Sequence, residues 1–179
     1  MLLKRDSMKK LVFILLCLVC FLSYSCTGEG KQKDREKIQE LELSTLEDAK
    51  VISYEKADSL INSYLEYVKK YPEDSLCATY LYRAADVYAN TKRCIESIDT
   101  YDRLIKQYPN DKHVESAYFL KGVVYSQTCL NKEKASEAFN LFIEKYPNSS
   151  LTNQARTLLI MDTMKDEMDL IRQFEQKNQ

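Results

Sequence analysis

Apart from its cysteines, this chain has few side chains whose type and spacing could do chemistry. His113 is the only histidine, and we expect it to be a solvated residue at a helix start. A single imidazole removes a multi-histidine metal site and weakens Ser-His-Asp or Cys-His catalysis. The 3 glycines form no phosphate-binding loop, and the carboxylates are scattered over expected polar helix faces. We therefore expect a protein that is not an enzyme and that uses no metal or cofactor.

Cys26 stands where an export signal would be cut. Four basic residues precede an unbroken apolar run at residues 11–22, and residues 23–26 read Ser-Tyr-Ser-Cys. This order of basic, apolar and small residues is that of a secretory signal. The run is shorter than the roughly 20 residues that a membrane-spanning helix needs. We therefore expect residues 1–25 to be a signal peptide.

The residues around the expected cut resemble a bacterial lipobox, in which the cysteine is lipidated and becomes the new N-terminus. The resemblance implies an acyl anchor at Cys26 that holds the protein on a membrane without spanning it. Tyr24 departs from the small residue that is usual there, and the alternative is an ordinary signal peptide with an incidental cysteine. Translation starts at Met1 or at Met8. Residues 26–50 then form a lipidated tether and a helical lead-in.

The composition predicts a folded body that does not bind nucleic acid. Charged residues make up 30% and hydrophobic residues 45% of the chain, which fits a packed domain. Without the four basic and one acidic side chains of the export segment, 22 basic and 26 acidic side chains remain, a net charge of −4. An acidic body lacks the excess of positive charge that neutralises phosphates.

All 3 prolines fall in one repeated motif, a tyrosine followed by proline. Pro72, Pro109 and Pro147 lie 37 and 38 residues apart, a period typical of a helical solenoid. Because proline cannot continue a helix, each motif predicts the end of one helix and the start of the next. The residues expected as N-caps of the following helices are Asp74, Asp111 and Ser149. Aromatic and aliphatic residues precede the prolines at helical spacing: Tyr64, Tyr67, Tyr101, Leu104, Phe139 and Phe142.

The repeat divides residues 51–179 into a stack of helical hairpins with a C-terminal capping helix. The expected elements are a helix at 54–71, hairpins at 74–108 and 111–146, and one or two closing helices at 150–177. Cys94 and Cys129 then lie in equivalent turns of adjacent hairpins. Partly buried thiols are the preferred interpretation for these two cysteines, and a disulfide, which needs Cα atoms within about 7 Å, is the alternative.

This pattern resembles the tetratricopeptide repeat. The small residues Ala85 and Gly122, each with a tyrosine three positions later, and the closing prolines match that repeat in order. Residues 109–125 also resemble the family of the outer-membrane assembly lipoprotein BamD. Residues 104–159 are similar to the TolA-binding periplasmic family called YbgF. The resemblance implies an all-α tetratricopeptide-like hairpin stack, a short right-handed solenoid.

The same resemblance implies a lipid-anchored, protein-binding adaptor of the bacterial envelope, at the outer membrane and facing the periplasm, accessory to outer-membrane protein assembly. Two alternatives stay open: a soluble TolA-binding-type partner in envelope constriction, and a lipoprotein that binds a small molecule or glycan. In tetratricopeptide stacks the first helix of each hairpin lines a partner-binding groove. By register, the groove residues here are Tyr82, Asp86, Asn90, Phe119, Val123 and Gln127. A core role for Tyr82 and Phe119 is the competing interpretation.

Overall fold

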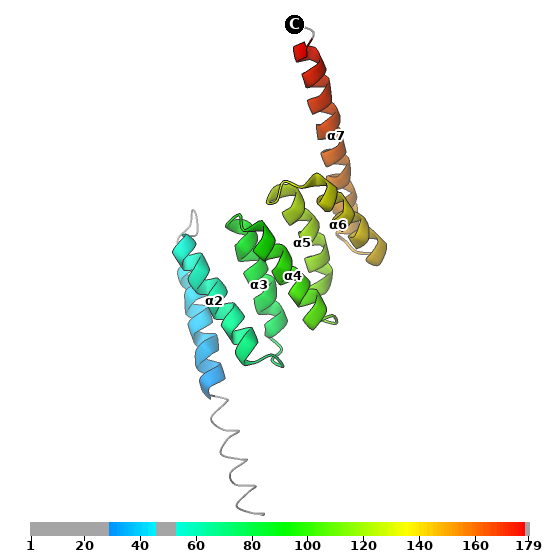
Figure 1. Ribbon diagram of the computed structural model, residues 1–179. Helices are drawn as coiled ribbons and strands as arrows, with labels where there is room; N and C mark the ends of the chain where they lie inside the picture. Colours follow the sequence, from blue (N-terminus) through cyan, green and yellow to red (C-terminus); the bar gives the residue numbers. More distant parts are fainter. Residues whose placement is uncertain (1–28, 46–52, 178–179) are drawn as a thin grey trace, which may run out of the picture. The chain divides into compact units, whose positions relative to one another are not determined.

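The computed structural model describes residues 29–45 and 53–177, and the chain divides into two units, residues 1–50 and 51–179. In the first unit the described part is one helix over residues 29–45 (Figure 1). The expected signal peptide and Cys26 lie outside the described residues.

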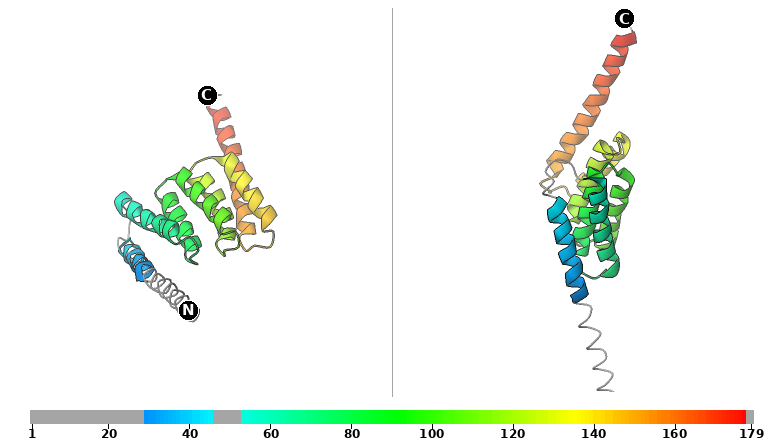
Figure 2. Two further views of the ribbon diagram at one scale, coloured as in Figure 1. Left: turned by 60° about the horizontal axis from the view of Figure 1, so that its bottom comes forward. Right: turned by 90° about the vertical axis from the view of Figure 1, so that its left-hand side faces the viewer.

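The second unit is a series of helices, with no strand among its described residues. They are α2 (Tyr54–Lys70), α3 (Cys77–Asn90), α4 (Cys94–Gln107), α5 (Val114–Gln127), α6 (Lys132–Lys145) and α7 (Thr152–Lys177). Helices that follow one another in the sequence pack side by side (Figure 2), most extensively α3 with α4 and α5 with α6. These two pairs are the expected hairpins, so the all-α hairpin stack is confirmed.

Each Tyr-Pro motif joins two helices with nearly the same backbone geometry. Tyr71, Tyr108 and Tyr146 end their helices with φ between −131° and −128° and ψ between 57° and 59°. They leave the helical region because the proline that follows disfavours it. Each tyrosine N–H still donates to the carbonyl four residues earlier, and each tyrosine carbonyl accepts from the N–H three residues later. The loops are therefore close copies of one another.

The expected N-caps are wrong in position, because α3, α5 and α7 begin three residues further along the chain than Asp74, Asp111 and Ser149. Each of these side chains instead accepts from the backbone N–H two residues later, at 3.0, 2.9 and 3.1 Å. Asp and Ser favour such a turn because their short side chains reach the nearby backbone. The side chains thus hold the loop that leads into each helix.

The residues before the prolines form the core, as their spacing predicts. Tyr67, Leu104 and Phe142 are at most 1% exposed, and the residues one turn earlier are buried as well. Gly122 lies against this core, and a Cβ built on it would come 2.5 Å from the ring of Phe139. A glycine at this position therefore lets α5 and α6 approach closely.

The last helix, α7, is 26 residues long, whereas α3 and α5 have 14 each. Near its start Ala155 is buried, and Leu158 and Leu159 are partly buried against the aromatic cluster of α5 and α6. The later part of α7 extends past the neighbouring helices (Figure 1). One continuous helix thus closes the stack.

Candidate functional site

The six positions expected to line a groove differ in their exposure. On α3, Tyr82 and Asp86 are half-buried and Asn90 is exposed. On α5, the equivalent residues 119, 123 and 127 are buried, half-buried and exposed. Only the last turn of each helix therefore offers a fully accessible side chain from this set, and the binding role of the set stays a prediction.

Phe119 serves the core, one of the two roles left open for it. Its side chain is 5% exposed, and its ring centroid lies 5.9 Å from that of Phe139 and 5.5 Å from that of Phe142. Aromatic rings at these separations stabilise a hydrophobic cluster. We therefore assign Phe119 to the contact between α5 and α6.

Tyr82 and Asp86 take part in a polar cluster that joins three helices. The ring of Tyr82 lies 6.0 Å from that of Tyr101 on α4 and 4.9 Å from that of His113 before α5. The hydroxyl of Tyr101 donates a hydrogen bond to the Asp86 carboxylate. These contacts make Tyr82 and Asp86 structural side chains within the stack.

His113 is not the solvated residue expected from the sequence. Its ring is 19% exposed, and Nδ1 lies 2.7 Å from the carboxylate of Asp111. The neighbouring hairpin supplies Tyr82 as a ring neighbour, and no pattern near His113 in the sequence predicts that contact. The histidine therefore helps to join the two hairpins.

The ionisable groups of this cluster respond to their burial. Burial raises the pKa of Asp86 above its ordinary value of 3.8, and the hydrogen bond from Tyr101 and the nearby His113 oppose that rise. Burial and the neighbouring carboxylate also raise the pKa of Tyr101. Both changes follow from the cost of placing charge in a medium of low dielectric.

A groove that the sequence did not predict lies between two successive Tyr-Pro loops. Its volume is about 730 Å³, and the loops at residues 72–75 and 108–111 form two of its walls. The rest of the lining comes from α2, α3 and α4: Val68, Lys69, Ala78, Arg103 and Gln107. The signal that could have found the groove is the motif itself, because two equal polar loops side by side leave a cleft between them.

Two reactive side chains near this groove are fixed in structural hydrogen bonds. The Cys77 thiol donates to the carbonyl of Tyr71 at 2.9 Å, and burial raises the pKa of this thiol. The hydroxyl of Tyr108 donates to the carbonyl of Pro72 at 2.8 Å and so ties the two loops together. Burial and the Cys77 thiol raise the pKa of Tyr108 to about 12. The arrangement favours binding over nucleophilic chemistry, which needs a thiolate.

The charges in the groove are of both signs. Lys69 and Arg103 contribute positive charge, and the two loops contribute the acidic residues Glu73, Asp74 and Asp111. Loop backbone and the side chain of Asn110 add neutral hydrogen-bonding groups. This mixture suits a peptide segment with polar backbone and side chains of either charge.

A smaller cavity of about 220 Å³ lies between α5 and α6. Tyr118, Tyr125 and Leu141 form its apolar walls. Lys134 lies 5.8 Å from the ring centroid of Tyr125, a cation–π distance. The cavity is smaller than the pockets of about 300–1,000 Å³ that hold drug-sized ligands, so we assign it no ligand.

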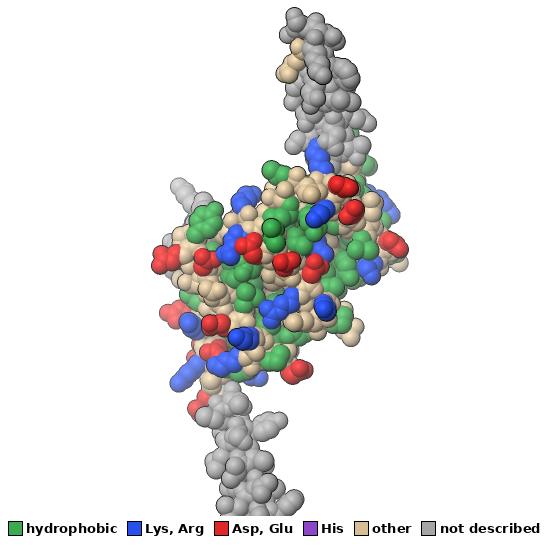
Figure 3. Space-filling view, viewed as in Figure 1, with side chains coloured by type: hydrophobic (Ala, Val, Ile, Leu, Met, Phe, Trp, Pro, Cys, Tyr) green, Lys and Arg blue, Asp and Glu red, His purple; other side chains and the backbone are tan. Residues whose placement is uncertain are grey.

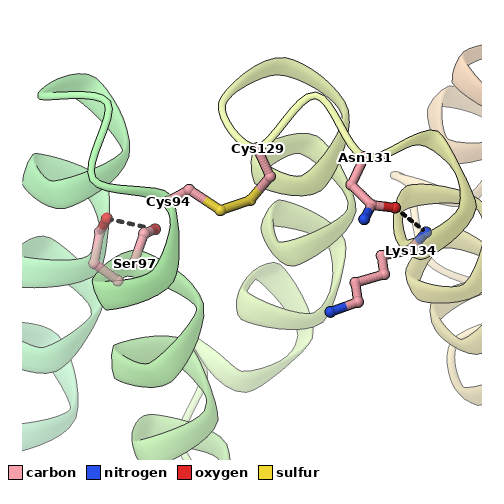
Figure 4. The surroundings of a disulfide bond; sticks show 6 residues. Cys94, Ser97, Cys129, Asn131 and Lys134 are labelled. Carbon is pink, nitrogen blue, oxygen red and sulfur yellow. Dashed lines mark hydrogen bonds between the residues drawn. A yellow bond between two sulfur atoms is a disulfide. The ribbon is translucent and has the colours of Figure 1, made fainter.

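The expectation of free thiols at Cys94 and Cys129 is wrong, because the two form a disulfide with a Cα–Cα distance of 5.2 Å. Figure 4 shows the bond joining the start of α4 to the loop before α6. Leu130 adopts a positive φ of 53° in that loop, and the Asn131 side chain accepts from the Lys134 N–H at 2.9 Å. These local conformations bring Cys129 close to α4, which spacing alone could not establish.

Figure 3 shows the distribution of charge on one face of the molecule. On the face in Figure 3, basic and acidic side chains are interspersed with hydrophobic ones. Within residues 29–45 and 53–177, no cluster of three or more His, Cys, Asp or Glu side chains could hold a metal ion. Among the described helices, none combines the length and apolar content of a membrane span.

A comparison with curated proteins gives no match. The chain does match the family described as outer membrane lipoprotein (YfiO) over residues 43–171, well over half of its length. The matched region takes in α2 to α6 and most of α7. The resemblance of residues 109–125 to BamD-type lipoproteins is thereby confirmed. The chain belongs to this outer membrane lipoprotein family.

Proposed function

We propose that this lipoprotein is a non-catalytic adaptor, anchored through an acylated Cys26, that binds a segment of another envelope protein. The groove between the Tyr-Pro loops is the observation that carries the proposal. It offers charges of both signs and loop backbone, while Cys77 and Tyr108 are fixed in structural hydrogen bonds. These features suit recognition of a peptide rather than chemistry on it.

The disulfide supports export of the body from the cytoplasm. Cysteine pairs such as Cys94–Cys129 form and persist in oxidising compartments, of which the bacterial periplasm is one. The signal-like residues 1–25 and the lipobox-like cysteine support the same route. We therefore place the helical body on the periplasmic side of the outer membrane.

The partner that we favour is a component of outer-membrane protein assembly, in keeping with the BamD-type family. The exposed positions Asn90 and Gln127 form a second contact region, as the register of the repeat predicts. A groove of about 730 Å³ is also of the size that holds small ligands, so a lipoprotein that binds a small molecule or glycan is the second candidate.

Membrane fractionation tests the anchor. We expect the wild-type protein to sediment with outer membranes and the Cys26→Ser variant to leave the membrane fraction or keep its signal segment. An acyl chain contributes membrane affinity that serine cannot replace. If both forms are soluble after processing, the anchor is wrong and the soluble TolA-binding-type alternative gains support.

Site-specific photo-crosslinking on the same membranes tests the groove. A photoreactive residue at Asn110 should capture a β-barrel assembly component, whereas one at Asn140, exposed on α6, should not. Positions 90 and 127 test the register-based region in parallel. Capture of Tol-type proteins would instead favour the envelope-constriction alternative. Absence of any captured protein, together with a thermal shift on adding glycans, would favour the ligand-binding lipoprotein.

A further inference from the structure

The two cations of the groove between the Tyr-Pro loops have no carboxylate partner within the described part of the chain. Arg103 is half-buried on α4, and its Nε donates to the side-chain oxygen of Gln107 at 3.1 Å. That amide is neutral, and no described carboxylate forms an ion pair with the rest of the guanidinium. Lys69, exposed at the end of α2, forms no ion pair with a described residue either. The groove therefore holds two positive charges that its own residues leave unmatched.

The acidic side chains of the groove are matched to a greater extent. Asp74 accepts from the backbone N–H of Leu76 at 3.0 Å. Asp111 accepts from the backbone N–H of His113 at 2.9 Å, and the Nδ1 atom of that histidine lies 2.7 Å away. Both carboxylates thus serve their own loops. Glu73, the remaining acidic residue of the lining, is exposed and forms no hydrogen bond with the described residues.

We propose that the segment bound in this groove carries an aspartate or glutamate side chain, whose carboxylate binds Arg103 and Lys69. The inference rests on the proposed peptide-binding function. A guanidinium presents its N–H groups in a planar fork that matches the two oxygens of a carboxylate. The half-buried guanidinium of Arg103 has lost part of its hydration, which such a carboxylate would replace. Lys69 adds a second positive charge from another helix.

A basic segment fits the same groove less well. Its cation would meet Arg103 and Lys69 as like charges, which is costly in an interface. The carboxylates of Asp74 and Asp111 already accept hydrogen bonds from their loops, so they have less to gain from a new donor. Glu73 is the one lining carboxylate without such bonds in the described chain, and it faces two unmatched cations. The balance of uncommitted charge therefore favours an acidic ligand.

A peptide-display selection on the full chain, purified from membranes in detergent, tests this preference. The probe is a library of short random peptides displayed within a scaffold loop, so every ligand carboxylate must come from a side chain. We expect the wild type to enrich peptides that contain Asp or Glu. The double variant Lys69→Gln and Arg103→Gln should lose that enrichment. Lys106→Gln should keep it, because Lys106 is an exposed lysine of α4 outside the groove lining.

Binding of one enriched peptide then measures the individual charges. The double variant should bind it about tenfold more weakly, or less, because charge-assisted hydrogen bonds are among the strong ones. Arg103→Lys should recover part of the loss, since it keeps the charge but not the fork. Glu73→Gln should strengthen binding about twofold to threefold, whereas a basic ligand would lose affinity. Thermal melts of each variant separate these effects from unfolding.

The inference and the proposed function fail in different ways. Enrichment of basic or uncharged peptides, or weaker binding after Glu73→Gln, would overturn the acidic preference and leave the peptide-binding function standing. If no peptide is enriched, photo-crosslinking from Asn110 in membranes decides between them. Capture that the double variant loses supports the acidic preference, and unchanged capture overturns it. If even the wild type captures no protein, the proposed function fails together with this inference.

Discussion

At the scale of single residues, the polar cluster around Asp86 shows how the stack uses its few titratable groups. The carboxylate lies half-buried between helices and accepts from the Tyr101 hydroxyl. That bond recovers part of the hydration lost on burial, but the pKa of Asp86 still stands above its ordinary value. The cluster therefore joins α3 to α4 at an electrostatic cost that depends on pH.

The pH dependence of stability should change when Asp86 becomes Asn. The folded chain holds the Asp86 proton more tightly than the unfolded chain, so stability falls as pH rises from the ordinary pKa of 3.8 through the raised one. An amide oxygen still accepts from Tyr101 and does not titrate. We expect Asp86→Asn to match the wild type at low pH and to melt a few degrees higher at neutral pH.

Thermal melts between pH 3.5 and 7 would measure this difference. Asp99→Asn serves as the control, because Asp99 is exposed on α4. If Asp86→Asn is less stable than the wild type at neutral pH, the charged hydrogen bond to Tyr101 outweighs the cost of burial, and our ordering of the two effects is wrong.

The role of a residue can be predicted from sequence where one strong physical reason explains its type at that position. The repeat pattern predicts a small residue at Gly122, and its close approach to Phe139 shows the physical reason. His113 was not predictable, because its environment comes from Tyr82 on the preceding hairpin. Side chains whose neighbours lie on another element carry no local signal of that contact.

At the scale of elements, the loops divide into two kinds with different determinants. The Tyr-Pro loops repeat one backbone geometry because proline fixes it locally, and sequence predicts them well. The turns within the hairpins instead hold Lys92 and Leu130 at positive φ values of 63° and 53°. Such conformations are uncommon for residues other than glycine, so sequence indicates the turns but not their shape. The course of the turn before α6 decides whether Cys129 meets Cys94.

The disulfide between these turns should contribute substantially to stability. It closes a loop between residues 35 positions apart, and a loop of this length corresponds to about 3–4 kcal/mol in the chain-entropy description. We expect a reducing agent to lower the free energy of unfolding in urea by about that amount. The double variant Cys94→Ala and Cys129→Ala should be equally destabilised and insensitive to the reducing agent. An effect of reduction that persists in the double variant would place its origin elsewhere.

At the scale of the whole molecule, the helical body is a short stack in which each hairpin needs its neighbour. The cluster of α5 and α6 is covered on its outer side by Ala155, Leu158 and Leu159 of α7. A hairpin that ends a solenoid without such a cover exposes its apolar side to water. The spacing of apolar residues in the last segment predicts a cap, but the sequence left open whether one helix or two would form it. The structure has one continuous helix of 26 residues.

The two parts of α7 should therefore differ in their importance for folding. Ending the chain after residue 150 removes all three covering side chains. A large apolar side chain contributes about 1.5–3 kcal/mol when fully buried, and Leu158 and Leu159 are partly buried, so the loss is a few kcal/mol of the roughly 5–15 kcal/mol that stabilises a domain. Ending the chain after residue 165 keeps this cover and removes only the later part of the helix.

Circular dichroism during urea unfolding would compare the two truncations. We expect the shorter chain to be largely unfolded or aggregated, and the longer one to unfold at nearly the wild-type urea concentration when both are dilute. Equal stability of the two chains would mean that the aromatic cluster of α5 and α6 is stable without α7. If the longer truncation is also unfolded, the later part of α7 is needed for folding within a single chain.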